Sequence, residues 1–196
     1  MYDFAVTSVR LLLKLIFRLQ VFGQEQIPSN GPLILACNHS SNWDPVLVGC
    51  LTPQPVSFMA KEELFRFRPL GALLRSLHAF PIKRGASDRA ALRLATTILE
   101  AGGTLVMFPE GTRKHQGSLE HLEKGVGFVA LRSETLMTPV VIMGSYRPFA
   151  RLQVSFGPPF NPVVILREQG LRPSIENVTE VIAQHMRDVK RGMNAC

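Results

Sequence analysis

The sequence predicts an α/β fold, a single-domain sandwich around a mostly parallel, mixed sheet flanked by helices. Short apolar runs typical of buried strands alternate with longer segments of helical periodicity over most of the chain. The chain has 196 residues, 46% of them hydrophobic, which is enough for one domain with a substantial core. No repeat or long linker divides it. We expect an N-terminal amphipathic helix over residues 1–21 and one folded domain over residues 22–196.

The segment 1–21 has the pattern of an amphipathic helix. At helical spacing its polar residues form one narrow stripe, and apolar residues cover the rest of the circumference. The charges interrupt the apolar run, so the segment does not match a spanning helix of about 20 apolar residues, nor does it match a signal peptide. It predicts a helix at a membrane interface. The alternative is a helix that packs over the protein's own core.

Seven segments are predicted to be strands, because each is a short apolar run next to turn residues or polar clusters. In chain order they are 21–28 (a strand and a turn), 32–37, 56–60, 79–84, 104–108, 139–143 and 152–156. The run 104–108 is apolar after its first residue, which favours a central strand covered on both faces.

Helices are predicted between these strands. Asp44 before Pro45 indicates a helix start, since Asp is a favoured N-cap and Pro is tolerated in the first turn. Pro69 separates two further helices, and Gly102-Gly103 ends a longer one. The helices after the first are predicted at 61–66, 70–77, 89–100, 124–134 and 174–190.

The charge balance indicates an anionic partner, such as a lipid surface or a phosphorylated substrate. The net charge is +7 and the isoelectric point is about 9.8. The segment 61–93 carries eight basic residues against three acidic ones. We expect no nucleic acid partner, because the basic residues form no cluster longer than a pair and no known reading motif.

The cysteines predict a reducing compartment. Cys37, Cys50 and Cys196 are an odd number without CxxC spacing, which argues against a disulfide framework and against a zinc site. No HxxxH, HExxH or P-loop pattern occurs, so we expect no metal and no nucleotide loop of that kind.

Three polar turns follow predicted strands, at 38–44, 83–85 and 109–113. The carboxyl ends of parallel strands share one edge of a sheet, and sites form there. His39 and Asp44 on the first turn are a candidate general base and the carboxylate that orients it. Arg84 and Arg113 on the other turns suit a phosphate, because guanidinium offers a permanently charged, bidentate fork.

These residues resemble the motifs of the glycerolipid acyltransferases. The first motif corresponds to Asn38-His39, four residues later Asp44, and then Pro45; the resemblance runs from about residue 20 to residue 160. The other three motifs correspond to Phe80–Arg84, Phe108–Arg113 and Thr138–Ile142. His78 and Lys83 depart from the second motif, at positions often held by Gly and by an acidic residue. The short chain with its N-terminal helix is most similar to bacterial 1-acylglycerol-3-phosphate acyltransferases.

The resemblance implies a direct acyl transfer. His39 would take the acceptor's hydroxyl proton while Asp44 holds its tautomer, with no Ser or Cys nucleophile, which agrees with the absence of a G-x-S-x-G elbow. Backbone N–H groups near Gly111 are candidates for steadying the oxyanion. The implied substrate-binding residues are Arg84 and Arg113 for the acceptor phosphate, and Glu110, Gly111 and Thr112 around the acceptor, with Asn38 and Lys83 as secondary candidates.

The implied reaction moves a fatty acyl chain from acyl-CoA or acyl carrier protein thioester to the sn-2 hydroxyl of 1-acylglycerol-3-phosphate, giving phosphatidic acid for phospholipid biosynthesis. It needs no cofactor beyond the thioester co-substrate. The expected partners are lysophosphatidate, the thioester, an anionic membrane surface and, as a further candidate, acyl carrier protein. The expected location is the cytoplasmic face of the cell membrane, as a peripheral or monotopic protein.

Several alternatives stay open. Glycerol-3-phosphate or another lysolipid is a different possible acceptor, and a non-catalytic, peripheral membrane-binding protein is the alternative from another class. The rival bases are His78, His115, His121 and His185. Of these, His78 competes most strongly because it precedes the Lys83-Arg84 turn.

Overall fold

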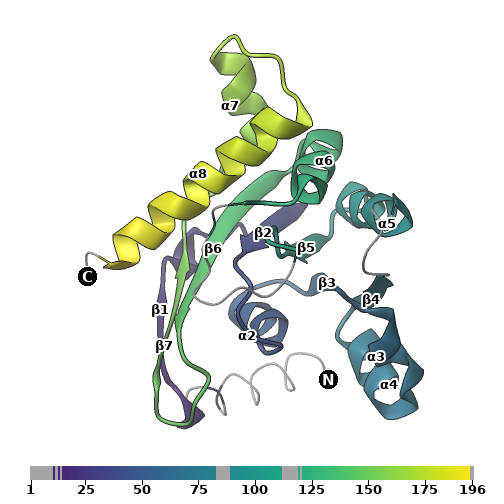
Figure 1. Ribbon diagram of the computed structural model, residues 1–196, viewed down its shortest axis with the longest axis vertical. Coiled ribbons are helices and arrows are strands. Elements are labelled where there is room, and N and C mark those ends of the chain that lie inside the picture. Colours follow the sequence, from purple (N-terminus) through teal and green to yellow (C-terminus); the bar gives the residue numbers. More distant parts are fainter. Residues whose placement is uncertain are drawn as a thin grey trace.

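The computed structural model describes residues 11, 13, 15–82, 89–111, 119 and 121–194, and within them a seven-stranded mixed sheet flanked by helices (Figure 1). The strand order is β1-β7-β6-β2-β5-β3-β4. All neighbours pair in parallel except β6 and β7, which are antiparallel. The predicted mostly parallel α/β sandwich is confirmed.

The strands are β1 (Arg18–Phe22), β2 (Leu33–Cys37), β3 (Val56–Lys61), β4 (Ala79–Ile82), β5 (Thr104–Met107), β6 (Leu136–Gly144) and β7 (Arg151–Phe156). The helices are η1 (Gln24–Gln26), α2 (Asp44–Leu51), α3 (Glu62–Arg66), α4 (Arg68–Ser76), α5 (Arg89–Glu100), α6 (Lys124–Ser133), α7 (Pro162–Glu168) and α8 (Ile175–Asn194). Most predicted elements occur within a few residues of their expected bounds.

Strand β2 is the centre of the sheet. All five of its residues are buried, because β5 and β6 flank it and helices cover both faces. Its side chains alternate between two cores, with Ile34 in one and Leu33 and Leu35 in the other.

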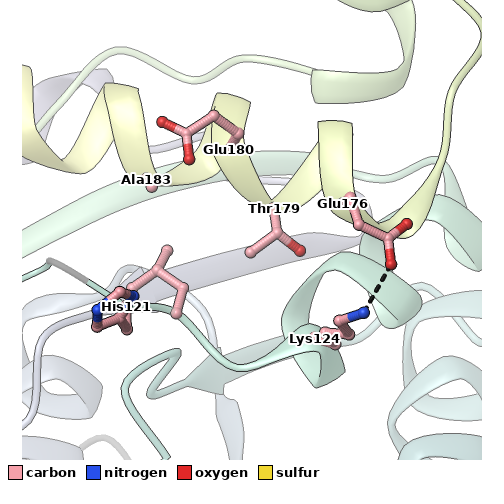
Figure 2. A pocket seen from close by; sticks show the side chains of 7 residues that line it. His121, Lys124, Glu176, Thr179, Glu180 and Ala183 are labelled. Carbon is pink, nitrogen blue, oxygen red and sulfur yellow. Dashed lines mark hydrogen bonds and ion pairs between the residues drawn. The ribbon is translucent and has the colours of Figure 1, made fainter.

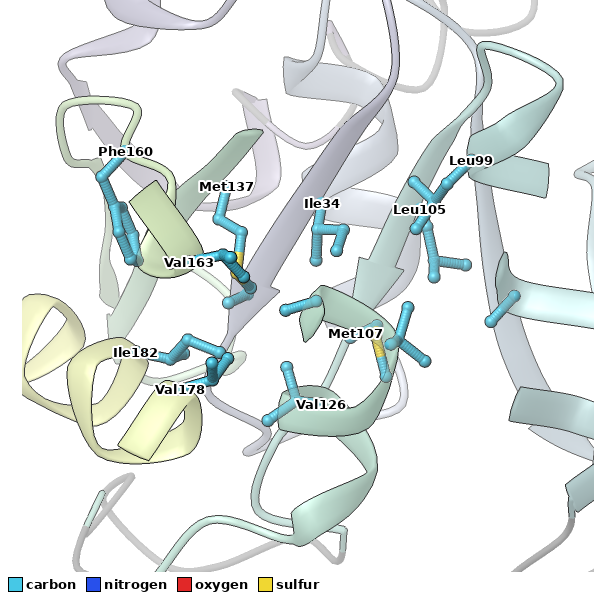
Figure 3. Packing of buried hydrophobic residues seen from close by; sticks show 14 of the residues in the cluster. Ile34, Leu99, Leu105, Met107, Val126, Met137, Phe160, Val163, Val178 and Ile182 are labelled. Atoms are coloured by element: carbon cyan, nitrogen blue, oxygen red, sulfur yellow. The ribbon is translucent and has the colours of Figure 1, made fainter. Parts of the chain in front are cut away.

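Each core joins one face of the sheet to its own helices. The first packs Ile34, Leu105 and Met137 against buried side chains of α5, α6, α7 and α8 (Figure 3). The second includes α2, with partly buried residues of α3 and α4 packed against it. In Figure 1, α6 and α8 lie above the sheet and α2 lies below it. Because β2 is buried on both faces, the turn that follows it has a fixed position at the edge of the sheet.

The N-terminal prediction needs a correction. Residues 1–10, 12 and 14 lie outside the described residues, but Arg18–Phe22 form β1, so a helix cannot extend to residue 21. Backbone pairing with the edge of β7 overrides the helical pattern here. The alternating burial of β1 fits this pairing, since Leu19 and Val21 pack against the second core.

Two further differences concern helices. Helix α7 was not predicted, although its start has a recognisable signal: the Asn161 side chain accepts the N–H groups of Val163 and Val164 at 3.0 and 3.2 Å, with Pro162 in the first turn. Helix α2 starts at Asp44 with Trp43 as its N-cap, so Asp44 is not the cap that the sequence predicted. Within the described residues, no helix combines the length and hydropathy that crossing a bilayer requires.

Candidate active site

The carboxyl ends of β2, β5 and β6 meet at one edge of the sheet, and the first polar turn starts there. Asn38, the first residue after β2, is 2% exposed. Its side-chain amide donates to the carbonyl of Ile142 at 2.9 Å, and its oxygen accepts the N–H of Ile142 at 2.7 Å. This two-point contact fixes the start of the turn to β6, so Asn38 has a positioning role.

His39 and Asp44 form the pair that the sequence predicted. The Nδ1 atom of His39 lies 2.9 Å from Oδ2 of Asp44; the Asp44 side chain is fully buried and that of His39 is 12% exposed. A carboxylate accepts hydrogen bonds, so this contact places the ring proton on Nδ1. The Nε2 atom then keeps its lone pair, which is the state of a general base.

The carboxylate of Asp44 receives three more short hydrogen bonds. The N–H groups of Ser40 and Ser41 donate to Oδ2 at 2.7 Å each, and the hydroxyl of Tyr146 donates to Oδ1 at 2.6 Å. A buried charge is tolerated only where donors replace its hydration. The turn 39–44 therefore wraps around the carboxylate instead of leaving it to cap α2.

An aromatic side chain at the end of β5 limits the motion of the imidazole. The ring of Phe108 stacks on that of His39, with centroids 4.2 Å apart and an interplanar angle of 29°. The hydrogen bond to Asp44 fixes one ring edge and Phe108 covers one ring face. Together they restrict the direction in which Nε2 points.

Glu110 holds the backbone of His39. Glu110 is 2% exposed, and its carboxylate accepts the N–H of His39 at 3.0 Å and that of Leu119 at 3.2 Å. Both carboxylate oxygens thus accept hydrogen bonds from backbone N–H groups, which gives Glu110 a positioning role. The direct acceptor contact expected from the resemblance stays a prediction.

The backbone conformation at position 111 requires a glycine. Its φ is +66°, and a Cβ there would lie 2.7 Å from Cγ of Glu123. Its N–H donates to the carbonyl of Phe108 at 3.1 Å. The backbone donor expected near Gly111 for the oxyanion is therefore not its own N–H in this structure.

The Cys37 thiol at the end of β2 is fully buried beside two carboxylates. Burial first, and then the charges of Asp44 and Glu110, raise its pKa well above the ordinary value. It stays a neutral thiol and is a poor nucleophile, because the thiolate is the reactive form.

The remaining predicted site residues, Lys83, Arg84, Thr112 and Arg113, lie outside the described residues. Ile82 ends β4, and Gly111 follows β5. These two positions are the last described ones before the basic segments, and they lie at or after the carboxyl ends of strands that run parallel to β2.

The rival histidines occupy other places. His78 precedes the amino end of β4, the third strand from β2. His185 lies on α8, where its ring stacks on Phe160 and its Nδ1 bonds to the carbonyl of Val181. His121 lines a hollow of about 220 Å³ beside α8, next to the ion pair of Lys124 and Glu176 at 2.7 Å (Figure 2). His115 lies outside the described residues.

Sequence reasoning missed Tyr146 and the role of Phe108 in the site. Tyr146 follows β6 by two residues and reaches Asp44 across 102 positions of sequence. A lone tyrosine after a predicted strand carries no signal for such a contact. In the part of the chain that the structure describes, His, Cys, Asp and Glu form no group of three able to hold a metal ion.

Comparisons with known proteins identify the family of the chain. The profile of the Acyltransferase family matches residues 18–143, more than half of the chain. The chain belongs to this family. The matched range contains His39, Asp44 and Glu110, but it ends before Tyr146.

Relatives with assigned names point the same way. A 1-acyl-sn-glycerol-3-phosphate acyltransferase of Bacillus subtilis is 28% identical over 74% of this chain and 72% of the relative. One of Streptococcus pneumoniae is 34% identical over 57% of this chain and 41% of the relative. The crystal structure of the 1-acyl-sn-glycerophosphate acyltransferase PlsC from Thermotoga maritima has a TM-score of 0.74 at 24% identity, covering 98% of this chain and 77% of that one. This last likeness supports the fold.

Glu110→Gln tests the positioning role. The amide would set an NH₂ group against one of the two backbone N–H donors, and a buried unpaired group costs about 1–3 kcal/mol. We expect the free energy of unfolding in urea to fall by about that amount, and kcat to fall at unchanged KM for the acyl acceptor. The exposed Glu168→Gln is the matched control. A raised acceptor KM at unchanged stability would instead indicate direct contact with the acceptor.

Proposed function

We propose that this protein transfers a fatty acyl chain from an acyl thioester to the sn-2 hydroxyl of 1-acylglycerol-3-phosphate, giving phosphatidic acid. The observation that carries this proposal is the ordered pair of His39 and Asp44 at the carboxyl edge of the sheet. The names of the relatives support the choice of acceptor.

The reaction follows from the orientation of the imidazole. Nε2 of His39 takes the hydroxyl proton as the oxygen attacks the thioester carbonyl, and Asp44 stabilises the imidazolium that forms. The tetrahedral intermediate then collapses, the C–S bond breaks, and the imidazolium returns the proton to the leaving thiolate. The buried, neutral Cys37 supports direct transfer without an acyl-enzyme on that residue.

The phosphate of the acceptor is assigned to the basic segments that follow β4 and β5. Arg84 and Arg113 provide the charge, with Lys83 beside them and Thr112 next to Arg113. The acyl donor is acyl-CoA or acyl carrier protein thioester, and no further cofactor is proposed.

The protein is assigned to the cytoplasmic face of the cell membrane, as a peripheral protein. Leu13 packs in the second core, whereas Leu11 and Leu15 are 60% and 68% exposed. Phe149 is 73% exposed, and its N–H donates to the carbonyl of Ile16 at 2.7 Å. Exposed apolar side chains at Leu11, Leu15 and Phe149 support the proposed membrane contact, and the burial of Leu13 places part of this segment against the core.

These apolar side chains lie beside basic ones. Arg18, Arg147 and Arg151 are exposed around the turn that joins β6 and β7, which lies at the bottom of Figure 1 with the start of β1. Apolar groups that enter the acyl boundary and arginines at the head groups are the two requirements of an anionic interface.

Removing the base tests the reaction. His39→Ala and Asp44→Ala should each lower kcat by about 100- to 10,000-fold, the usual contribution of general-base catalysis. Thiol release from acyl-CoA in the presence of lysophosphatidate measures kcat, and the midpoint of thermal unfolding shows whether each variant is folded. The matched control is His121→Ala, on the exposed loop before α6. Substantial turnover in folded His39→Ala would contradict the assignment, and no thiol release in the unsubstituted protein would favour the non-catalytic alternative.

Arg84→Ala and Arg113→Ala test the phosphate assignment. Each should raise the KM for lysophosphatidate, because a bidentate charge contact is lost. Activity with monoacylglycerol, which lacks the phosphate, should stay unchanged. Arg93→Ala is the matched control, since Arg93 is exposed on α5. An equal loss with both acceptors would remove the phosphate-binding role. Comparing glycerol-3-phosphate and other lysolipids in the same assay separates the alternative acceptors.

Leu15→Ser and Phe149→Ser test the membrane contact. Each should weaken binding to phosphatidylglycerol-containing vesicles about 10- to 150-fold, because a buried Leu or Phe side chain contributes about 1.5–3 kcal/mol. The control is Leu171→Ser, 50% exposed in the connection between α7 and α8. These substitutions are preferable to deleting residues 1–21, which would remove buried Leu13 and β1. Vesicle affinity unchanged by both substitutions would contradict the contact.

A further inference from the structure

Tyr146 connects β6 to the catalytic pair. It follows the last residue of β6, Gly144, by two positions, and β6 is a direct neighbour of β2. Its hydroxyl donates to Oδ1 of Asp44 at 2.6 Å. The tyrosine thus approaches the carboxylate from a different element than the turn that carries His39.

The two oxygens of Asp44 are held from different sides. Oδ2 faces Nδ1 of His39 and the N–H groups of Ser40 and Ser41, all at 2.9 Å or less. Oδ1 receives the Tyr146 hydroxyl, and otherwise only a longer contact of 3.4 Å from the Ser40 hydroxyl. Among the described residues, Tyr146 makes the one short hydrogen bond that these contacts give to Oδ1.

The tyrosine is a donor and not an acceptor in this contact. Burial first, then the charge of Asp44 and the hydrogen bond to it, raise the pKa of Tyr146 far above its usual range. The phenol therefore keeps its proton near neutral pH and donates a hydrogen bond to Asp44.

The Tyr146 ring is itself held by the N-terminal segment. The ring of Phe17 meets it edge to face, with centroids 5.7 Å apart and an interplanar angle of 83°. Phe17 directly precedes β1 and is half-buried against the second core. Packing and hydrogen bonding together leave the hydroxyl little freedom to leave Asp44.

We propose that Tyr146 is a positioning residue of the acyl transfer, which orients Asp44 and limits how strongly that carboxylate stabilises the imidazolium form of His39. This proposal rests on the proposed function, because it assigns a role in that reaction. A strong donor on Oδ1 draws negative charge away from Oδ2, the oxygen that faces the imidazole. Without it, Oδ2 would favour protonated His39 more, and less of the enzyme would carry a free base.

The contacts of His39 show by which route a change at Tyr146 can reach its imidazole. Among the described residues, the contacts of His39 are with Asp44 from α2, Glu110 after β5 and Phe108, and the neutral Cys37 thiol lies near the two carboxylates. The Glu110 carboxylate contacts the His39 backbone and not its ring. A change at Tyr146 should therefore reach the imidazole through Asp44.

Tyr146→Phe tests the proposal, because it removes only the hydroxyl and keeps the ring that packs on Phe17. We expect the acid limb of the kcat/KM profile to move to higher pH by about half a unit to one unit. We also expect kcat on the plateau to fall about 3- to 30-fold, because a carboxylate without its donor on Oδ1 orients the imidazole less well, with the KM for lysophosphatidate unchanged. In an Asp44→Asn background, Tyr146→Phe should have little further effect, since the two residues act through one contact.

Phe17→Leu is the control for packing alone. It should lower the thermal midpoint and leave the acid limb in place, because the hydroxyl still reaches Asp44. An unmoved acid limb in Tyr146→Phe, or an equal loss in the Asp44→Asn background, would overturn the proposal and leave Tyr146 a structural residue.

A readout independent of turnover separates this proposal from the proposed function. The ring signals of His39 can be followed by NMR as a function of pH in the unsubstituted protein and in Tyr146→Phe. A titration midpoint that moves to higher pH supports the coupling even if lysophosphatidate is not the acceptor. Identical midpoints would overturn it whatever the reaction is.

Discussion

The arrangement of the site depends on the buried carboxylate of Asp44. Four donors lie within 2.9 Å of its oxygens, from His39, Ser40, Ser41 and Tyr146. A charge without solvent exposure is costly unless its hydrogen-bonding capacity is filled, so these contacts are needed for folding as well as for chemistry. The same contacts give the imidazole its tautomer. Stability and reactivity therefore share one group.

The sheet provides the frame that makes this possible. Strand β2 is buried on both faces and flanked by β5 and β6, which brings Phe108, Glu110 and Tyr146 to one edge with His39. The Asn38 side chain forms two hydrogen bonds with the backbone of Ile142, which fix the position of the turn relative to β6. Each neighbouring strand thus contributes to the restraint of the pair: Phe108 and Glu110 follow β5, and Tyr146 follows β6.

The difference between local patterns and contacts across the sheet explains which features the sequence predicted. The buried strand before Asn38 and the short, polar spacing from His39 to Asp44 are local patterns, and the structure has both. The contact of Glu110 with the His39 backbone and that of Tyr146 with Asp44 span 71 and 102 positions, so they follow from strand order and register, which no local pattern specifies. The helix predicted over residues 1–21 was too long for the same reason, because the pairing of β1 with β7 depends on a distant edge.

The central claim is that Asp44 fixes the protonated nitrogen of His39 so that Nε2 is free to act as a base. Nitrogen NMR of the labelled histidine ring at a pH where it is neutral measures this directly. The account predicts a proton on Nδ1 and none on Nε2 in the unsubstituted protein, and loss of that preference in Asp44→Ala. A neutral ring with its proton on Nε2 would contradict it, because that tautomer cannot accept the hydroxyl proton at Nε2.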